Sequence, residues 1–261
     1  MFKQTVLRKK LKDNRPIIGT WNTLASPLVT EVIAQAGFDF QIIDLEHGPF
    51  ILNEIHHHVS ACESGSVCSP LVRIPSNQGW MALQSLDQGA HGIVVPHIRD
   101  ADAAQTIAQA IKYHPHGNRG FTPFSKAGGF SNINAVKYVS TANQETIGVA
   151  IIECLKGLDN VQEIASVHGV DVIYFGAYDL SQALGRPGEH RHPDVISAIQ
   201  RGVAQVHSLG KCAGGFVPQS KDDIKWLLDM GMRFITYEVD ISMIFRHTRD
   251  IRDWFESEVS A

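Results

Sequence analysis

The chain has 261 residues and a formal net charge of −4 at pH 7, which gives no electrostatic reason to expect nucleic acid or an anionic membrane as a partner. Hydrophobic residues make up 44% and charged residues 19%, as in globular proteins, which excludes a disordered chain. No apolar run approaches the roughly 20 residues of a membrane span. The basic start, residues 1–16, lacks the apolar stretch of a secretory signal and is predicted to form a short helix that caps the fold.

Eight short apolar or β-branched runs alternate along the chain with segments of helical length. Several runs are apolar on both faces, such as Ile93-Val94-Val95, which is typical of strands buried on both sides in a parallel sheet. The predicted strands are Pro16–Asn22, Phe38–Asp44, Pro70–Ile74, Gly92–Pro96, Ile147–Glu153, Val170–Gly176, Ala213–Val217 and Phe234–Val239.

Helical patterns fill most of the intervals, and five of the first six end at a glycine, the residue favoured just after a helix. The predicted helices are Ser26–Gly37, Asn77–Gly89, Asp100–Lys112, Leu158–Gly169, His192–Gly210, Ser220–Gly231 and, at the end, Ser242 to about Val259. The stretch Tyr113–Glu145 is a long connection without a clear strand. Connections of this length are usually functional or cover an interface.

Strands that alternate with helices eight times predict a single (β/α)8 TIM barrel that occupies residues 1–261 as one domain. An open doubly wound sheet is the alternative fold. That fold usually has fewer strands and a glycine-rich phosphate turn, and neither GxGxxG nor GxxxxGK[ST] occurs in the chain. The four cysteines form no CxxC pair and are predicted to be free thiols of a cytoplasmic protein.

The predicted carboxyl ends of the strands carry reactive side chains. His47, Arg73, His97, Glu153 and Asp179 each follow or end a different strand. In a TIM barrel these ends meet on the catalytic face. The alternative interpretation is that all five are ordinary polar loop residues.

Glu153 and Asp179 on neighbouring strands have the oxygen ligands that suit Mg²⁺ or Mn²⁺, with positions left open for substrate. Two such acids are also common as helix caps or in ion pairs. Arg73 offers planar donors for an oxyanion or carboxylate, although a surface ion pair is its alternative role. His47 is a candidate base near neutral pH, with a structural histidine as the alternative.

Ten motifs along nearly the whole chain match one known family in order. They are Gly19-Thr20-Trp21, Ser26-Pro27, Gly37-Phe38-Asp39, Asp44-Leu45-Glu46-His47-Gly48, Val72-Arg73, Leu86-Asp87-Gln88-Gly89, Val94-Val95-Pro96, Tyr113–Gly120, Ile152-Glu153 and Gly176-Ala177-Tyr178-Asp179-Leu180-Ser181. With these motifs the chain resembles the HpcH/HpaI family of metal-dependent pyruvate aldolases, such as those acting on 2-dehydro-3-deoxyglucarate or 4-hydroxy-2-oxo-heptanedioate. The spacing from the glutamate to Asp-Leu-Ser is the most specific part of the match.

The resemblance implies a role for each matched residue. Glu153 and Asp179 would be ligands of a divalent ion (Mg²⁺ or Mn²⁺, with Co²⁺ as a further option). His47 would be the general base, oriented by Asp87, and Arg73 would bind the 2-oxo oxygen. Backbone N–H groups of Ala177, Tyr178 and Asp179 would hold the pyruvate carboxylate. The resemblance also implies a homohexamer, a trimer of dimers, whose last helix is exchanged between subunits.

The chain departs from the family pattern at three positions. Ile151 replaces a glutamine common two residues before the metal glutamate, which puts the water network of the metal in doubt. Ala177 replaces a common proline. His97 follows Val95-Pro96, where many aldolases have a nonpolar residue. In having a histidine at this position the chain resembles macrophomate synthase, a relative that decarboxylates oxaloacetate.

The sequence leaves three candidate functions open. The first is a class II aldolase, a carbon–carbon lyase that reversibly cleaves a 4-hydroxy-2-oxo acid to pyruvate and an aldehyde. The second is an oxaloacetate decarboxylase or macrophomate-synthase-like enzyme, which is favoured if His97 points at the metal pocket as a substrate-binding residue. The third is a barrel retained for binding or assembly. A Schiff-base mechanism is not expected, because none of the eleven lysines ends a predicted strand.

Overall fold

The eight strands form a closed parallel barrel in sequence order, which confirms the predicted (β/α)8 fold. This computed structural model describes residues 5–65, 67–132 and 134–260. The strands are β1 (Ile17–Asn22), β2 (Phe40–Asp44), β3 (Ser69–Arg73), β4 (Gly92–Val95), β5 (Ile147–Ile152), β6 (Val172–Phe175), β7 (Cys212–Gly215) and β8 (Phe234–Val239). That residues 1–261 make up one domain remains a prediction.

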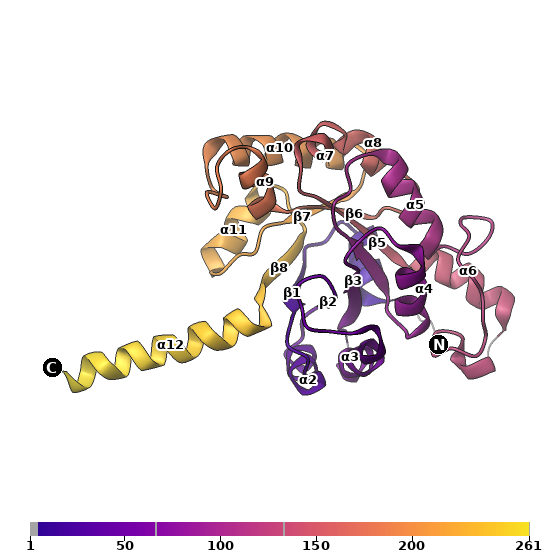
Figure 1. The fold of residues 1–261 in the computed structure, drawn as a ribbon, viewed down its shortest axis with the longest axis horizontal. Coiled ribbons are helices and arrows are strands. Elements are labelled where there is room, and N and C mark those ends of the chain that lie inside the picture. The colour runs from indigo at the N-terminus through magenta and orange to yellow at the C-terminus, as the bar shows by residue number, and fades with distance from the viewer. Residues whose placement is uncertain (1–4, 66, 133, 261) are drawn as a thin grey trace.

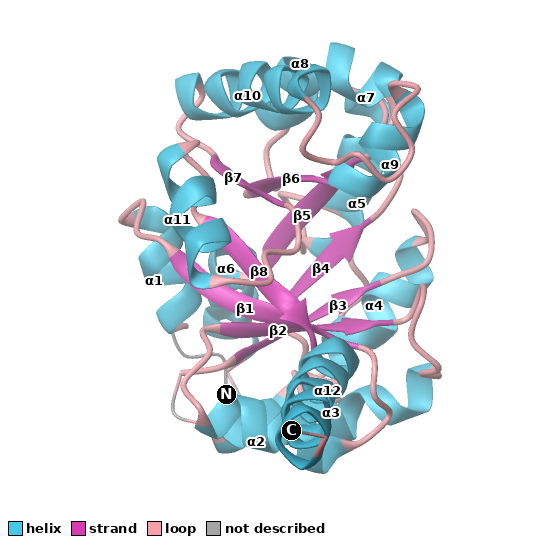
Figure 2. Cartoon of the chain, turned by 90° about the vertical axis from the view of Figure 1, so that its left-hand side faces the viewer, coloured by secondary structure: helices cyan, strands magenta, loops and turns pink. Residues whose placement is uncertain are grey.

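Helices surround the barrel on its outside (Figure 2). They are α1 (Val6–Lys12), α2 (Pro27–Gln35), α3 (Ile55–Ser64), α4 (Gly79–Asp87), α5 (Ala101–Ile111), α6 (Ala135–Glu145), α7 (Leu155–Asp159), α8 (Val161–Ser166), α9 (Ala177–Ala183), α10 (Pro193–Ser208), α11 (Lys221–Asp229) and α12 (Asp240–Val259), with 3-10 turns η1 (Leu52–Glu54) and η2 (Gly129–Ser131). No described helix has both the length and the apolar character needed to cross a bilayer.

The glycines that end predicted helices adopt the left-handed conformation that this position requires. Gly37, Gly89, Gly169, Gly210 and Gly231 have φ values of 90°, 102°, 103°, 66° and 91°. A residue with a Cβ atom is strained there, so these glycines stop their helices and turn the chain toward the next strand.

Some predicted boundaries were wrong for local reasons. The helix predicted over Leu158–Gly169 is two helices, α7 and α8, because Asn160 leaves the helical conformation (φ −105°, ψ 14°) and donates its side-chain N–H to the Arg99 carbonyl (3.0 Å). The strand predicted to reach Val217 ends at Gly215, because Phe216 has a φ of 58°.

The long connection Tyr113–Glu145 contains a helix that the sequence analysis did not predict. This helix, α6, begins after Asn134, whose side chain accepts a hydrogen bond from the Lys137 N–H (3.0 Å). The short helix α9, which directly follows β6, was also not predicted, because it covers only seven residues and no apolar period is readable over that length.

The hydrophobic core has two layers, which the alternation of the strands separates. One layer fills the barrel and includes Phe40 and Phe234, whose rings stack at 4.2 Å between centroids. The other layer lies between the strands and the outer helices and includes Ile93, Ile173 and Phe175. Because every second residue of a strand faces inward, the interior positions continue to the ends of the barrel.

The last helix, α12, leaves the barrel as an arm (Figure 1). Its first residue, Asp240, is buried, and its carboxylate accepts hydrogen bonds from the N–H groups of Thr23 (2.9 Å) and Leu24 (2.9 Å). Asp240 is the only buried residue of α12. The helix is therefore anchored at its first turn and presents the rest of its length to its surroundings.

The stability of the fold is expected to fall in acid because of His91, next to the amino end of β4. Burial lowers the pKa of this imidazole from 6.5 to about 4. Below pH 6.5 the unfolded chain takes up a proton that the folded chain does not, so stability is lost as the pH falls from 6.5 toward 4. At about 1.4 kcal/mol per pKa unit, the loss is at most about 3 kcal/mol.

Urea unfolding measured across this pH range checks this expectation. His91→Gln should flatten the dependence of the free energy of unfolding on pH, whereas His56→Gln, at an exposed position of α3, should not. Equal pH dependence in His91→Gln and in the unaltered chain would contradict the assignment.

Candidate active site

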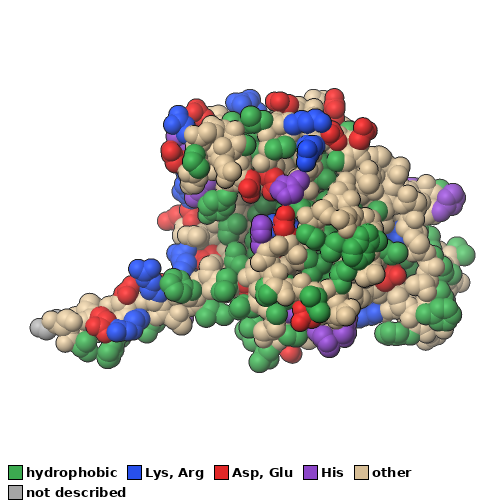
Figure 3. All heavy atoms as spheres, in the orientation of Figure 1, with side chains coloured by type: hydrophobic (Ala, Val, Ile, Leu, Met, Phe, Trp, Pro, Cys, Tyr) green, Lys and Arg blue, Asp and Glu red, His purple; other side chains and the backbone are tan. Residues whose placement is uncertain are grey.

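The barrel mouth at the carboxyl ends of the strands is lined by charged side chains. Asp44, Arg73 and Glu153 each lie two residues after an apolar side chain of the barrel interior. Since the alternation of a strand has a period of two, these three side chains point into the mouth. In the space-filling view, acidic and histidine side chains gather near the middle of the visible face (Figure 3).

Arg73 is held in place by two carboxylates and an aromatic ring. Its Nε donates to Asp44 Oδ1 (2.7 Å), its Nη2 also bonds Asp44, and its Nη1 lies 3.0 Å from Glu46 Oε2. Its guanidinium carbon lies 4.3 Å from the centroid of the Trp21 ring. Arg73 therefore combines a bidentate ion pair with a cation–π contact.

The guanidinium of Arg73 keeps donors for another molecule. A guanidinium has five N–H groups, and the contacts with Asp44 and Glu46 use three of them. The Arg73 side chain is held by these contacts, and at 11% exposure it is still accessible to a molecule in the mouth. The predicted ion-pair role and the predicted donor role of Arg73 are thus compatible.

His97 joins the two acids Glu153 and Glu46. Its Nδ1 lies 2.5 Å from Glu153 Oε1, its Nε2 lies 3.4 Å from Glu46 Oε1, and its backbone N–H donates to Glu153 Oε1 (2.6 Å). His97 has a φ of 57°, a conformation that costs free energy in any residue with a Cβ atom. The contacts with Glu153 hold the strained backbone and place the imidazole, which is 59% exposed, beside the two acids.

The two oxygens of Glu153 have different surroundings. Oε1 accepts a hydrogen bond from the His97 N–H and contacts the His97 Nδ1, whereas Oε2 has no hydrogen-bond partner among the described residues and faces Gly176. A Cβ atom at Gly176 would lie 3.3 Å from Oε2, so only glycine leaves this side of the carboxylate open. Burial raises the pKa of Glu153, the charges of Asp179 and Glu46 raise it further, and His97 opposes them.

Asp179 lies in the first turn of α9, directly after β6, and its side chain is exposed. Because Leu180 donates the first backbone hydrogen bond of this helix to Gly176 (2.9 Å), the N–H groups of Ala177, Tyr178 and Asp179 precede the hydrogen-bonded turns. Among them Ala177 is buried, whereas Tyr178 is 47% exposed.

Among the described residues, His47 and Asp87 form no hydrogen bond with each other. The His47 N–H donates to Asp44 Oδ1 (3.3 Å), at the carboxyl end of β2. Asp87 ends α4, where the chain returns toward the amino ends of the strands, and its carboxylate accepts from Arg119 Nη2 (2.7 Å). The predicted pairing of His47 with Asp87 therefore stays a prediction.

The donor set at the mouth fits a hard divalent ion held by few protein ligands. The carboxylates of Asp44 and Glu46 lie at the end of β2, and those of Glu153 and Asp179 follow the neighbouring strands β5 and β6. Arg73 contacts Asp44 and Glu46, and His97 contacts Glu46 and Glu153. The described residues include no group of three or more His, Cys, Asp or Glu side chains that would hold a metal by themselves. A two-carboxylate set completed by substrate and water remains consistent with this arrangement.

Asp44, Glu46 and Trp21 were not predicted as site residues. All three belong to quoted motifs, and the available signal was their position: Asp44 ends a predicted strand, Glu46 follows it, and Trp21 is the residue before the end of another. Ile151, whose replacement of glutamine was noted, is buried inside the barrel with Trp21 and Tyr174. An apolar side chain therefore forms the floor beneath the charged mouth.

A parallel eight-stranded barrel with charged side chains at its carboxyl mouth defines the chain as a TIM-barrel protein with an enzyme-type site. The family described as HpcH/HpaI aldolase/citrate lyase matches residues 17–246. The chain belongs to the HpcH/HpaI aldolase/citrate lyase family, as the sequence motifs predicted.

Curated relatives within this family are named aldolases. A hydroxypyruvate/pyruvate aldolase of Roseobacter denitrificans is 34% identical over 245 residues, which cover 94% of each chain. A 5-keto-4-deoxy-D-glucarate aldolase of Salmonella paratyphi C is 33% identical over 239 residues, which cover 92% of each. These relatives confirm the predicted enzyme class, a carbon–carbon lyase.

Solved structures of related proteins share the fold. A family protein of Burkholderia cenocepacia has a TM-score of 0.90 and 30% identity, with coverage of 96% of this chain and 98% of the other. Macrophomate synthase has a TM-score of 0.87 and 26% identity, with coverage of 97% of this chain and 90% of the other.

Proposed function

We propose that this protein is a class II aldolase that reversibly cleaves a 4-hydroxy-2-oxo acid to pyruvate and an aldehyde. The observation that carries the proposal is the arrangement at the mouth, where Glu153 and Asp179 follow the neighbouring strands β5 and β6 and Arg73 ends β3 of the same barrel. The aldolase names of the curated relatives support the same reaction.

Glu153 and Asp179 would hold the divalent ion, Mg²⁺ or Mn²⁺ and alternatively Co²⁺. The ion would act as a Lewis acid for the charge that develops on the 2-oxo acid. Glu153 offers its Oε2 for this purpose, since His97 occupies Oε1. The described lysines give no Schiff-base alternative, because none directly follows a strand and Lys156 pairs with Asp100 (2.7 Å).

Residues of the chain would bind the substrate and move its proton. The remaining N–H groups of Arg73 would bind the 2-oxo oxygen and stabilise its negative charge. The N–H groups at the start of α9, those of Ala177, Tyr178 and Asp179, would hold the carboxylate. His47 would take the proton of the C4 hydroxyl. Asp87 is the orienting group that the family resemblance implies, although within this chain its carboxylate is bound to Arg119.

A screen of aldol cleavage tests the proposal. Racemic 4-hydroxy-2-oxo acids of different length are supplied with Mg²⁺, Mn²⁺ or Co²⁺, and pyruvate is measured by coupling to lactate dehydrogenase. Metal-dependent pyruvate release that stops with EDTA is expected. No cleavage with any metal, or a pyruvate adduct trapped by borohydride in EDTA, would refute the proposal.

The second candidate function, decarboxylation of oxaloacetate or carbon–carbon bond formation as in macrophomate synthase, is favoured by one observation. The exposed imidazole of His97 contacts Glu153, a proposed ligand of the ion, and Glu46 at the barrel mouth. His97 would then bind substrate as well as position Glu153.

His97→Leu is expected to lower turnover by about 10- to 100-fold, because outer partners of a metal-binding carboxylate typically contribute this much. The measurement compares pyruvate release from oxaloacetate with release from a hydroxy-oxo acid, with His56→Leu as the control. A larger loss with oxaloacetate supports the second function, and equal losses assign His97 to the positioning of Glu153. Unchanged turnover of both substrates would remove His97 from the site.

The proposal includes a homohexamer, a trimer of dimers, in which α12 is exchanged between subunits. Seven apolar side chains of α12 are at least half exposed: Ile241, Ile244, Phe245, Ile251, Trp254, Phe255 and Val259. Each side chain of this size gains about 1.5–3 kcal/mol when it is buried, so α12 favours association.

Replacing both Phe245 and Phe255 by Asp is expected to shift the assembly to a smaller species, because charges would be buried at the contact. Light scattering coupled to size-exclusion chromatography measures the mass. The control changes Arg249 and Asp253, an ion pair on the same helix (3.4 Å), to Ala. An unchanged mass in the Asp variant would contradict the exchange of α12.

A cytoplasmic location also remains a prediction, and the four cysteines are free in the structure.

A further inference from the structure

A cavity of about 940 Å³ lies on the opposite side of the barrel from the candidate active site. Asp171 and Lys211 directly precede β6 and β7, and Lys112 directly follows α5, which places the cavity at the amino ends of the strands. Helices α1 and α6 and the segment between α5 and α6 contribute the other walls.

The charged residues that line this cavity are predominantly basic. Among the described residues, Asp171 is its one acidic side chain, against the basic side chains of Arg8, Lys12, Lys112, Arg119 and Lys211. His114, His116 and His168 also line it. The cavity thus has an excess of positive charge in a chain whose net charge is negative.

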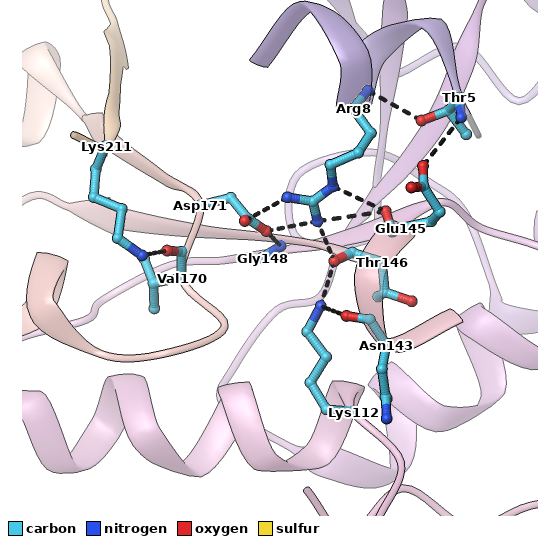
Figure 4. Close-up of polar contacts among 10 residues, drawn as sticks. All are labelled: Thr5, Arg8, Lys112, Asn143, Glu145, Thr146, Gly148, Val170, Asp171 and Lys211. Carbon is cyan, nitrogen blue, oxygen red and sulfur yellow. Dashed lines mark hydrogen bonds and ion pairs between the residues drawn. The ribbon is translucent and has the colours of Figure 1, made fainter. Parts of the chain in front are cut away.

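The acid of the cavity is already engaged. Asp171 accepts from Arg8 Nη1 (2.5 Å) and Nη2 (3.0 Å), and also from the Gly148 N–H (2.9 Å), as Figure 4 shows. This contact ties α1 to the amino end of the barrel, and it pairs the positive charge of Arg8 with the carboxylate of Asp171. It leaves the two lysines of the cavity floor without a carboxylate partner.

Lys112 and Lys211 bond only to backbone carbonyls among the described residues. Lys112 Nζ donates to two carbonyls at the carboxyl end of α6 (2.8 and 2.7 Å), and Lys211 Nζ donates to the carbonyl of Val170 (2.5 Å) (Figure 4). Lys112 is 4% exposed, and burial lowers its pKa to about 8, an effect that Arg8 and Lys211 increase and that Asp171 and Glu145 oppose. An anion in the cavity would add to the partial compensation that Asp171 gives both lysines and Glu145 gives Lys112.

Arg119 supplies further donors. Its side chain is fully buried, and its Nη2 donates to Asp87 (2.7 Å). Its Nε and Nη1 are buried without a hydrogen-bond partner in the part of the chain that the structure describes. Buried N–H groups without a partner cost free energy, so an acceptor that reached them from the cavity would be stabilised.

The remaining wall is apolar and open. Phe121 is 44% exposed and Val136 is 82% exposed, and both line the cavity beside Tyr113 and Val139. The Arg119 guanidinium carbon lies 4.5 Å from the Tyr113 ring centroid, so the basic and the apolar walls adjoin. If the basic residues served only to anchor α1 to the barrel, the exposed apolar side chains beside them would have no function.

We propose that this cavity binds a small organic anion, with a phosphate or carboxylate head against the basic floor and an aromatic or aliphatic body against the apolar wall. The site lies apart from the barrel mouth, and its link with the proposed aldolase residues is Arg119, which is bound to Asp87. The basic residues recognise the charge, and the area around Tyr113, Phe121, Val136 and Val139 recognises the body.

Calorimetric titration of the full chain in EDTA, with three probes, tests the proposal. Phenyl phosphate carries both features, whereas inorganic phosphate has only the charge and phenol only the ring. We expect phenyl phosphate to bind at one site per chain with a Kd of about 1 mM or tighter. Inorganic phosphate should bind more weakly, and phenol should show no saturable binding.

Variants locate the binding. Lys211→Met removes one charge and should weaken phenyl phosphate binding by about tenfold. Val136→Asp, at an exposed position that leaves the fold intact, should weaken it through like charge. Lys225→Met, an exposed lysine of α11, and Glu153→Ala, in the barrel mouth, should bind as the unaltered chain does.

Three results would overturn the inference. They are the absence of saturable phenyl phosphate binding, binding that neither Lys211→Met nor Val136→Asp weakens, and binding that Glu153→Ala abolishes. The last result would move the anion to the barrel mouth.

Discussion

Glu153→Ala is expected to abolish metal-dependent turnover, by about 10³-fold or more, and to leave the barrel folded. The side chain is 8% exposed in the mouth, and it contributes one of the two carboxylates proposed for the ion. Its removal costs the contacts with His97, but it also relieves the repulsion from Asp179 and Glu46 that raises the pKa of Glu153. Pyruvate release measured over a metal titration gives the loss.

A second variant and a control separate charge from shape. Glu153→Gln keeps the size of the side chain and an acceptor for the His97 N–H, yet it should be as inactive as the alanine variant because it lacks the charge. Glu163→Ala, at an exposed position of α8, should be fully active. If Glu153→Ala retained its turnover after dialysis against a chelator, Glu153 would not belong to the site.

Arg73→Lys is expected to lower kcat/KM by about 10²- to 10³-fold, although the charge is retained. The guanidinium bonds Asp44 through two nitrogens and Glu46 through a third, and it lies over the Trp21 ring. The single ammonium of a lysine has three donors and no planar fork. It would be occupied by these carboxylates and would leave fewer donors for a 2-oxo oxygen.

Steady-state kinetics with a cleaved hydroxy-oxo acid, together with thermal unfolding, measures this effect. Arg186→Lys is the matched control, since Arg186 is 43% exposed and lies 3.6 Å from Asp194 at the surface. Kinetics of Arg73→Lys equal to those of the unaltered chain would exclude the proposed role in enolate stabilisation. Loss of activity that merely follows a loss of folded protein would assign Arg73 to stability.

Much of the fold was predictable from local patterns. The doubly apolar runs indicated a parallel sheet, and the glycines with positive φ marked the helix ends, because both signals lie within a few residues of chain. The helices α6 and α9 were missed, because α9 is short and α6 lies in a connection without a regular period. The positions of His47, Arg73, His97, Glu153 and Asp179 at strand ends followed directly from the strand prediction.

The sequence by itself determined the barrel, the family and the set of charged residues at its mouth, because hydrophobic periodicity and motifs are properties of short stretches of sequence. Only the tertiary structure decided the partners: Asp44 lies beside Arg73 in the register of β2 and β3, His97 reaches Glu153 from a position 56 residues away, and Asp87 is bound to Arg119. Such pairs depend on strand register and side-chain direction, which no short stretch of sequence specifies.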